Sequence, residues 1–205
     1  MFSDTASLAF VAGSRHITRM QDRQFFGYGS LVNRATHDYP GTRPARLDGW
    51  RRVWVHTNLR PVAYLSVERA ECSIDGLVAE VPGADWAALD ERERAYDRHP
   101  VETVLHACGS DARAQVYAVP ASHAAPPDVT HPVLLSYIDT VVQGFLNVFG
   151  TGGAERFFAT TAGWTAPILN DRAAPRYPRH QPVTDWQRGF VDSHLNALSA
   201  QVHKA

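Results

Sequence analysis

The order of the predicted elements indicates an α+β fold, in which the first half of the chain supplies an antiparallel or mixed sheet and the second half supplies helices. Five short runs rich in β-branched or aromatic residues lie between residues 24 and 119, separated by Pro, Gly, Asn and acidic residues. Sustained helical periodicity begins only after residue 132. Because the strands precede the helices instead of alternating with them, a doubly wound parallel sheet is disfavoured.

The strands are predicted from these five runs, each of strand length. The first run stops at two glycines, which is the pattern of a strand that enters a tight turn. In chain order the runs are QFFGYGSL (24–31), RLDGWRRVWV (46–55), PVAYLSV (61–67), SIDGLVAEV (73–81) and AQVYAV (114–119).

A short helix is predicted between the fourth and fifth runs. Asp85 can cap its N-terminus, and Trp86 and Leu89 lie three residues apart on one face. The five charged residues from Asp90 to Arg94 are expected on the solvent side of this helix.

The second half of the chain is predicted to be mainly helical. Four prolines between Pro120 and Pro132 mark a linker or a long surface loop. A long helix follows and stops at Gly150, and a shorter helix resumes over residues 152–164. A final helix opens at Thr184 or Asp185, with an apolar stripe formed by Trp186, Phe190, Val191, Leu195, Leu198 and Val202.

Length and charge exclude several classes of protein. The chain has 205 residues, which suits one large domain over residues 23–205, with a core at 24–120, a helical extension at 130–205 and an N-terminal arm at 1–22. The formal net charge of −1 disfavours nucleic acid and anionic membrane as partners. No segment near the start is long enough to span a bilayer. We therefore expect a soluble cytoplasmic protein, either a monomer or a homodimer.

The cysteine and histidine pattern does not predict a metal or another cofactor. Cys72 and Cys108 are too few for a disulfide framework or a Cys-rich zinc site, although a single bridge is possible. The ten histidines include neither an HExxH motif nor a pair at i, i+4.

The glycine turn after the first strand is one candidate binding element. Glycines flank Tyr28 on both sides, so the backbone can turn sharply and direct its N–H groups at an anion or carboxylate. Ser30 adds a hydroxyl. The turn is not a nucleophile elbow and not a P-loop, because it lacks the G-x-S-x-G order and a following Lys. The alternative is that a strand simply ends in a turn.

The second candidate is the charged segment LDERERAY at residues 89–96. Taken alone, acidic and basic neighbours on a helix are more typical of a solvated face than of a site. The segment becomes informative in combination with FGYGSL at 26–31 and GWRRVW at 49–54, because the three motifs follow one another in the first half of the chain.

This ordered set resembles the γ-glutamylcyclotransferase-like superfamily, which includes AIG2-like and ChaC-like γ-glutamylcyclotransferases. The resemblance covers about residues 24–120 and implies a small mixed β-barrel with flanking helices. It implies that Glu93 is the catalytic acid/base and that Tyr96 lines the pocket. The substrate loop corresponds to Tyr28, Gly29, Ser30 and Leu31. Glu91 would point elsewhere, since two helical residues are about 200° apart around the axis.

The implied activity is that of an enzyme that cyclises a γ-glutamyl compound to 5-oxoproline and releases an amine or amino acid. The reaction is intramolecular, so it requires no protein nucleophile, metal or cofactor. Glutathione, γ-glutamyl dipeptides and γ-glutamyl amines all remain open as substrates. Two alternatives also remain: a non-catalytic module that binds a small ligand on the same fold, and a cyclotransferase acting on a larger biosynthetic intermediate.

The Pro-rich segment at residues 163–182 is the predicted specificity loop. Its large polar and aromatic side chains suit a wall that pairs with a substrate carboxylate. A solvated loop that crosses the surface is the alternative. The candidate residues are Trp164, Arg172, Tyr177, Arg179 and His180.

Overall fold

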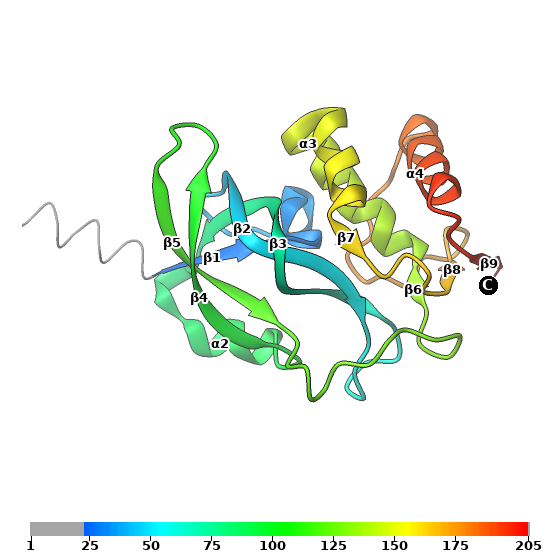
Figure 1. The fold of residues 1–205 in the computed structure, drawn as a ribbon, viewed down its shortest axis with the longest axis horizontal. Helices are drawn as coiled ribbons and strands as arrows, with labels where there is room; N and C mark the ends of the chain where they lie inside the picture. Colours follow the sequence, from blue (N-terminus) through cyan, green and yellow to red (C-terminus); the bar gives the residue numbers. More distant parts are fainter. Residues whose placement is uncertain (1–22, 205) are drawn as a thin grey trace, which may run out of the picture.

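Five strands form a closed mixed β-barrel in the computed structural model, which describes residues 23–204 (Figure 1). The barrel order is β3-β1-β5-β4-β2, and β2 pairs again with β3 to close it. Only the β1–β5 pair is parallel among these pairings. The predicted arm at 1–22 lies outside the described residues. The strands are β1 (Gln24–Gly27), β2 (Arg43–Val55), β3 (Tyr64–Glu80), β4 (Asp97–Leu105) and β5 (Asp111–Ala118).

The α+β prediction is confirmed, but two of the predicted strands are one. Residues 64–67 of one predicted strand and 73–80 of the next belong to the single 17-residue strand β3, which pairs with β2 along almost its whole length. The residues between them, Glu68 to Cys72, alternate between partly buried and exposed positions. In the sequence this charged, half-exposed stretch looks like a loop between two strands, although it continues the strand. Opposite it, the β2 register shifts at Gly49, whose positive φ of 79° bends the ribbon.

The helices lie at their predicted positions, except that the segment predicted over residues 152–164 ends at Ala159 and is followed by a short strand at Thr161–Ala162. Helix α2 (Trp86–Arg92) is capped by Asp85, whose side chain accepts from the Ala88 N–H at 3.1 Å. Helix α3 (Leu135–Ala159) is broken at Gly150, where φ is 67°, so the predicted stop and resumption are both present. Helix α4 (Asp185–Ala197) has a complete capping box at Thr184.

The C-terminal half also contains short elements that the sequence did not reveal. A three-stranded parallel sheet has the order β6-β8-β9, and β7 adds to the edge of β2. Val202 lies in β9, beyond the end of α4, so its predicted place on the helical stripe is wrong. These strands are β6 (Val133–Leu134), β7 (Thr161–Ala162), β8 (Ile168–Asn170) and β9 (Val202–Lys204); three short 3₁₀ turns are η1 (Ser30–Val32), η2 (Arg34–Thr36) and η3 (Pro82–Ala84).

The barrel and helix α3 share one hydrophobic core. Trp54 of the barrel packs against Trp164 with ring centroids 5.5 Å apart and against Tyr137 at 5.8 Å. Phe145 and Phe157 of α3 are fully buried in the same cluster. Figure 1 shows α3 lying between the barrel and α4. Within residues 23–204, none of the helices has both the length and the apolar character needed to cross a membrane.

Two helical glycines give opposite predictions for stability. An added Cβ at Gly144 in α3 would lie 2.5 Å from the backbone nitrogen of Asn33, whereas one at Gly189 in α4 would meet nothing within 4 Å. We expect Gly144→Ala to destabilise the protein by about 1–3 kcal/mol through overpacking. Gly189→Ala should stabilise it by up to about 1 kcal/mol through helix propensity. Urea unfolding of both variants tests this, and stabilisation by Gly144→Ala would contradict the packing described.

Candidate active site

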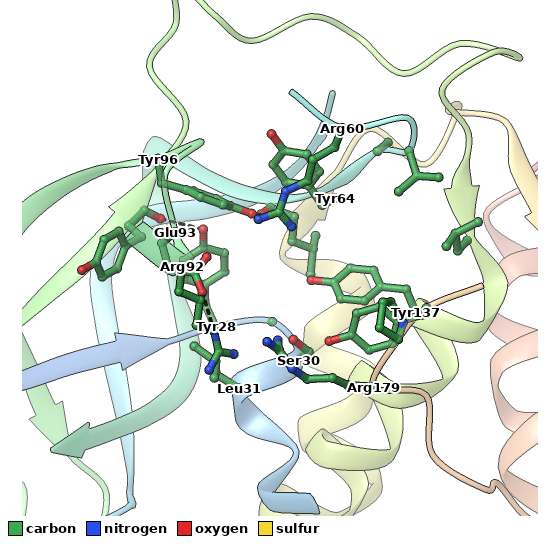
Figure 2. A pocket seen from close by; sticks show the side chains of 18 of the residues that line it. Tyr28, Ser30, Leu31, Arg60, Tyr64, Arg92, Glu93, Tyr96, Tyr137 and Arg179 are labelled. Atoms are coloured by element: carbon green, nitrogen blue, oxygen red, sulfur yellow. Dashed lines mark hydrogen bonds and ion pairs between the residues drawn. The ribbon is translucent and has the colours of Figure 1, made fainter. Parts of the chain in front are cut away.

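A cavity of about 830 Å³ lies where the barrel meets the C-terminal half (Figure 2). Its walls come from several segments that are distant in sequence. The main ones are the loop after β1, the turn before β3, the end of α2, the loop before β6, the first turn of α3 and the loop before α4, and Tyr117 of β5 also contributes. Two of the three motifs singled out in the sequence, FGYGSL and LDERERAY, thus meet at the cavity with a helix and a loop from the second half, whereas GWRRVW does not line it.

Glu93 lies on the wall of this cavity. Helix α2 ends at Arg92, and Glu93 leaves the helical path with φ −99° and ψ 26°, while its N–H donates to the Leu89 carbonyl at 2.9 Å. Its side chain is only 17% exposed. The helix pattern placed Glu93 on the solvent side, and this expectation is wrong because the helix terminates one residue earlier. Among the residues that the structure describes, Glu93 is the one carboxylate that lines the cavity.

Glu91 occupies a different environment. Its side chain is 80% exposed, lies 3.8 Å from the Arg94 guanidinium and does not contribute to the cavity wall. The end of α2 therefore separates the two acids, with Glu93 on the cavity wall and Glu91 in solvent; the cause is the end of the helix at Arg92 and not the helical angle between the two residues.

Arg92 is the charged neighbour of Glu93. Its Nε lies 3.2 Å from Glu93 Oε1, which is an ion-pair distance, yet Nε forms no hydrogen bond, so the pair is close but poorly aligned. Its Nη1 donates to the Tyr39 hydroxyl at 2.9 Å. The Glu93 carboxylate consequently keeps lone pairs that are available to a ligand.

The loop from Tyr28 to Leu31 forms the floor of the cavity. Val32 and Asn33 donate their N–H groups within turn η1, and the first N–H groups of such a turn, here those of Ser30 and Leu31, have no partner inside it. Gly29 permits a close approach, because a Cβ at this position would lie 2.9 Å from the Tyr137 hydroxyl oxygen. The predicted binding loop thus faces a helix from the other half of the chain.

Arg52, the second arginine of the GWRRVW motif, supports this loop from within the core. It is fully buried, and its Nε donates to the Tyr28 carbonyl at 2.8 Å. Its two other nitrogens donate to Thr160 Oγ1, at 2.9 Å, and to the Asp75 carbonyl. Burial lowers the pKa of Arg52 to about 9, a shift that Asp75 opposes, so the group is still a cation at neutral pH.

Tyrosines dominate the polar lining of the cavity. The Tyr28 hydroxyl donates to the Tyr117 carbonyl at 2.6 Å, and the Tyr96 hydroxyl donates to the Leu65 carbonyl at 2.9 Å. Burial raises the pKa of Tyr28, Tyr96 and Tyr137 well above the usual value, and the nearby Glu93 charge adds to each shift. These phenols therefore remain neutral at physiological pH.

The predicted specificity loop contributes two of its five candidate residues to the cavity. Tyr177 and Arg179 line it. Trp164 is instead buried in the core, where its Nε1 donates to the Phe158 carbonyl at 3.1 Å. His180 folds back onto the Tyr177 carbonyl at 3.0 Å. Arg172 is engaged elsewhere, because it binds Asp139 and Asp192.

Several lining residues had no recognisable signal in the sequence. Tyr137 belongs to the apolar stripe of α3, and helical periodicity does not distinguish the barrel core from a cavity wall. Arg60 and Tyr64 flank the turn into β3, with the Arg60 guanidinium 5.0 Å from the Tyr64 ring centroid. Arg176 lies in the loop before α4.

His56, Asp128 and His131 bring three potential metal-ligand atoms within 4.8 Å of one another beside the cavity. The two imidazole rings lie face to face, with centroids 4.2 Å apart and planes 3° from parallel. A metal must lie close to the plane of each imidazole that binds it, and parallel stacked planes do not meet. The cluster as it stands therefore does not form a metal site, and a ring would have to rotate to create one.

Comparison with known proteins adds independent findings to this geometry. The model of a family described as gamma-glutamyl cyclotransferase, AIG2-like, matches residues 25–134, which is more than half of the chain. The chain belongs to this family. No curated protein matches the sequence. The match ends before α3, so Tyr137, Arg176 and Arg179 lie outside the part shared with the family model.

Solved structures also share the fold of this protein, and two of them are compared here. A structure titled gamma-glutamyl cyclotransferase has a TM-score of 0.54 at 15% identity, covering 83% of this chain and 98% of that one. YkqA from Bacillus subtilis has a TM-score of 0.53 at 15% identity, covering 65% of this chain and 52% of its own. Both likenesses confirm the expected barrel with flanking helices.

The contacts of Arg52 predict a large cost for its removal. Arg52→Met leaves the carbonyls of Tyr28 and Asp75 buried without a donor, so we expect a loss of about 3 kcal/mol or more of unfolding free energy. Arg51→Met, one residue away on β2, removes only a half-exposed pair with Glu68 and should cost less than about 1 kcal/mol. Urea unfolding measures both, and equal effects would contradict the supporting role of Arg52.

Proposed function

We propose that this protein is a γ-glutamylcyclotransferase that converts a γ-glutamyl compound into 5-oxoproline and a free amine or amino acid, with Glu93 as general acid and base. The observation that carries the proposal is the position of Glu93, a partly buried carboxylate on a cavity wall that also contains the glycine loop. Figure 2 places Glu93 at one end of the cavity, beside Tyr28 and Tyr96.

The proposed reaction requires one proton acceptor. The α-ammonium of the substrate titrates near 8 and is mostly protonated at pH 7, so a base must remove a proton before the nitrogen attacks. Glu93 takes that proton, the α-nitrogen bonds to the γ-carbonyl carbon, and the bond from that carbon to the leaving nitrogen breaks. Glu93 gives that proton to the leaving nitrogen as the bond breaks, and it then carries the second proton from the new ring nitrogen to the released amine, which departs as an ammonium. Atoms and charges balance without any other reactant.

The cavity restricts which residue performs this step. Tyr28 and Tyr96 donate their hydroxyls to backbone carbonyls, and burial raises their pKa well above the usual value. They are therefore held as neutral phenols and do not serve as bases at pH 7. Because Glu93 is the one carboxylate on the described cavity wall, it is the residue best suited to accept the proton.

The glycine loop is proposed to bind the γ-glutamyl half of the substrate. The N–H groups of Ser30 and Leu31 at the start of η1, together with the Ser30 hydroxyl, suit the α-carboxylate or the developing oxyanion. Gly29 keeps the approach to the loop free of a side chain. Tyr28 and Tyr96 form the walls that fold the substrate into a compact shape, in which proximity supplies much of the rate.

Glu93→Gln tests the proposal directly. Glutamine keeps the size of the side chain but accepts no proton, so we expect 5-oxoproline release to fall by about 10²–10⁴-fold. The matched control is Glu91→Gln, which alters an 80% exposed acid two residues away and should leave the rate largely intact. Mass spectrometry of 5-oxoproline from γ-glutamyl dipeptides, glutathione and γ-glutamyl amines measures both.

Two results would overturn this assignment in different ways. A folded Glu93→Gln protein that keeps full activity would show that another group is the base. Failure of the unmodified protein to release 5-oxoproline from every compound would favour the alternative of a binding module with the same fold.

A further inference from the structure

The wall of the cavity carries more positive than negative charge. Four arginines line it, namely Arg60, Arg92, Arg176 and Arg179, against the single carboxylate of Glu93. Arg92 lies at ion-pair distance from Glu93. Within residues 23–204, none of the other three arginines forms an ion pair with a carboxylate. Three arginines at the wall of one cavity thus have no acidic partner from the described chain, and two of them, Arg176 and Arg179, are exposed to solvent.

These arginines lie apart from the proposed base. Arg60 reaches the cavity from the turn before β3, where it stacks on Tyr64. Arg176 and Arg179 come from the loop between β8 and α4. In Figure 2, Arg60 and Arg179 extend toward the cavity from opposite walls, while Glu93 lies to one side of both. The space beside Glu93 thus continues toward the arginines, so a substrate whose ammonium contacts Glu93 has room for its leaving half there.

Buried acids hold the arginine-bearing loop in place. Asp171 is a buried residue, only 2% exposed. Its carboxylate accepts hydrogen bonds from the Ser136 N–H at 2.8 Å, the Ser136 hydroxyl at 2.6 Å and the Arg176 backbone N–H at 2.8 Å. Arg172 binds Asp139 of α3 through two hydrogen bonds of 2.7 Å. The loop is consequently fixed to the start of α3 before any ligand binds, which lowers the ordering cost of binding.

Like charges gathered in a partly apolar cavity repel one another, and an anionic ligand relieves that repulsion. We propose that the natural substrates are γ-glutamyl compounds whose leaving half carries two carboxylates, as in γ-glutamylglutamate, and that Arg60, Arg176 and Arg179 bind those carboxylates. This inference rests on the cyclotransferase function proposed above. In this arrangement Glu93 contacts the substrate's ammonium and the glycine loop binds its α-carboxylate. The arginines bind its two remaining carboxylates.

A series of three substrates of similar size tests the charge requirement. γ-Glutamylglutamate, γ-glutamylglutamine and γ-glutamylglutaminamide carry two, one and no carboxylates on the leaving half. We expect kcat/KM for 5-oxoproline release to fall by about tenfold for each carboxylate removed, with most of the change in KM. The differences should shrink when the salt concentration is raised from 20 mM to about 500 mM, because screening weakens partly exposed charge pairs.

Arginine variants assign the effect to the cavity. Arg60→Gln, Arg176→Gln and Arg179→Gln should each reduce the preference for γ-glutamylglutamate over γ-glutamylglutamine, and the triple variant should abolish it. Arg94→Gln is the matched control, because Arg94 is 67% exposed and lies outside the cavity, and it should keep the full preference. Thermal unfolding of each variant verifies that it is folded, and a triple variant that does not fold leaves the three single variants to decide.

The outcomes separate this inference from the proposed function. Equal kcat/KM for all three substrates, or an undiminished preference in all three single variants, overturns the charge inference while the cyclotransferase assignment stands. If no substrate is turned over, the function fails, and calorimetry with the unmodified protein decides the inference alone. Tighter binding of γ-glutamylglutamate than of γ-glutamylglutamine, by about tenfold, then supports an anion-selective cavity. Equal binding overturns it.

Discussion

The guanidinium of Arg52 joins the three parts of the chain on which the site depends. It binds the carbonyl of Tyr28 in the glycine loop, the carbonyl of Asp75 in β3 and the hydroxyl of Thr160 at the end of α3. Its face lies 4.8 Å from the Phe145 ring centroid. A fully buried cation is costly unless each of its N–H donors has an acceptor. Arg52 therefore stabilises the one arrangement of loop, barrel and helix in which these three acceptors surround it.

This arrangement lets the two halves of the chain supply different parts of the cavity. The barrel half provides the glycine loop and, at the end of α2, Glu93. The helical half provides Tyr137 over the loop and the arginines before α4, which are fixed through Asp171 and Arg172. The family model covers the first set and not the second. We therefore propose that the chemistry belongs to the barrel half, and that Arg60 of that half and the arginines of the extension together select the leaving group.

Local patterns predicted much of this structure because local physics determines it. Asp85 and Thr184 start helices through side-chain caps, and Gly150 interrupts α3 with a positive φ, all of which a sequence displays directly. The continuity of β3 was not predictable, because its charged, half-exposed middle looks like a loop in the sequence, and only its pairing with β2 shows that the strand continues. The pairing of β3 with β2, which is a tertiary contact, decides that β3 is one strand.

The same distinction applies to the site. The motif predicted a site role for Glu93, which lines the cavity, although the helical pattern alone placed it in solvent, since one residue decides where α2 ends. Arg172 and Trp164 have the chemistry of cavity residues but are used for anchoring and for the core. Arg60 and Tyr137 required the fold before their position could be known. Residue type thus indicated the chemistry, whereas the packing of α3 against the barrel selected which residues face the cavity.

The most direct measurement of the cyclotransferase proposal follows isotopes through one turnover. γ-Glutamylglutamate labelled with ¹⁵N at the α-amine of its γ-glutamyl half is incubated with the protein in H₂¹⁸O, and the products are analysed by mass spectrometry. Intramolecular attack predicts 5-oxoproline that retains the ¹⁵N in its ring and released glutamate, neither of which has gained ¹⁸O from the reaction. Labelled glutamate that carries ¹⁸O in its γ-carboxylate would show hydrolysis by water and contradict the proposal.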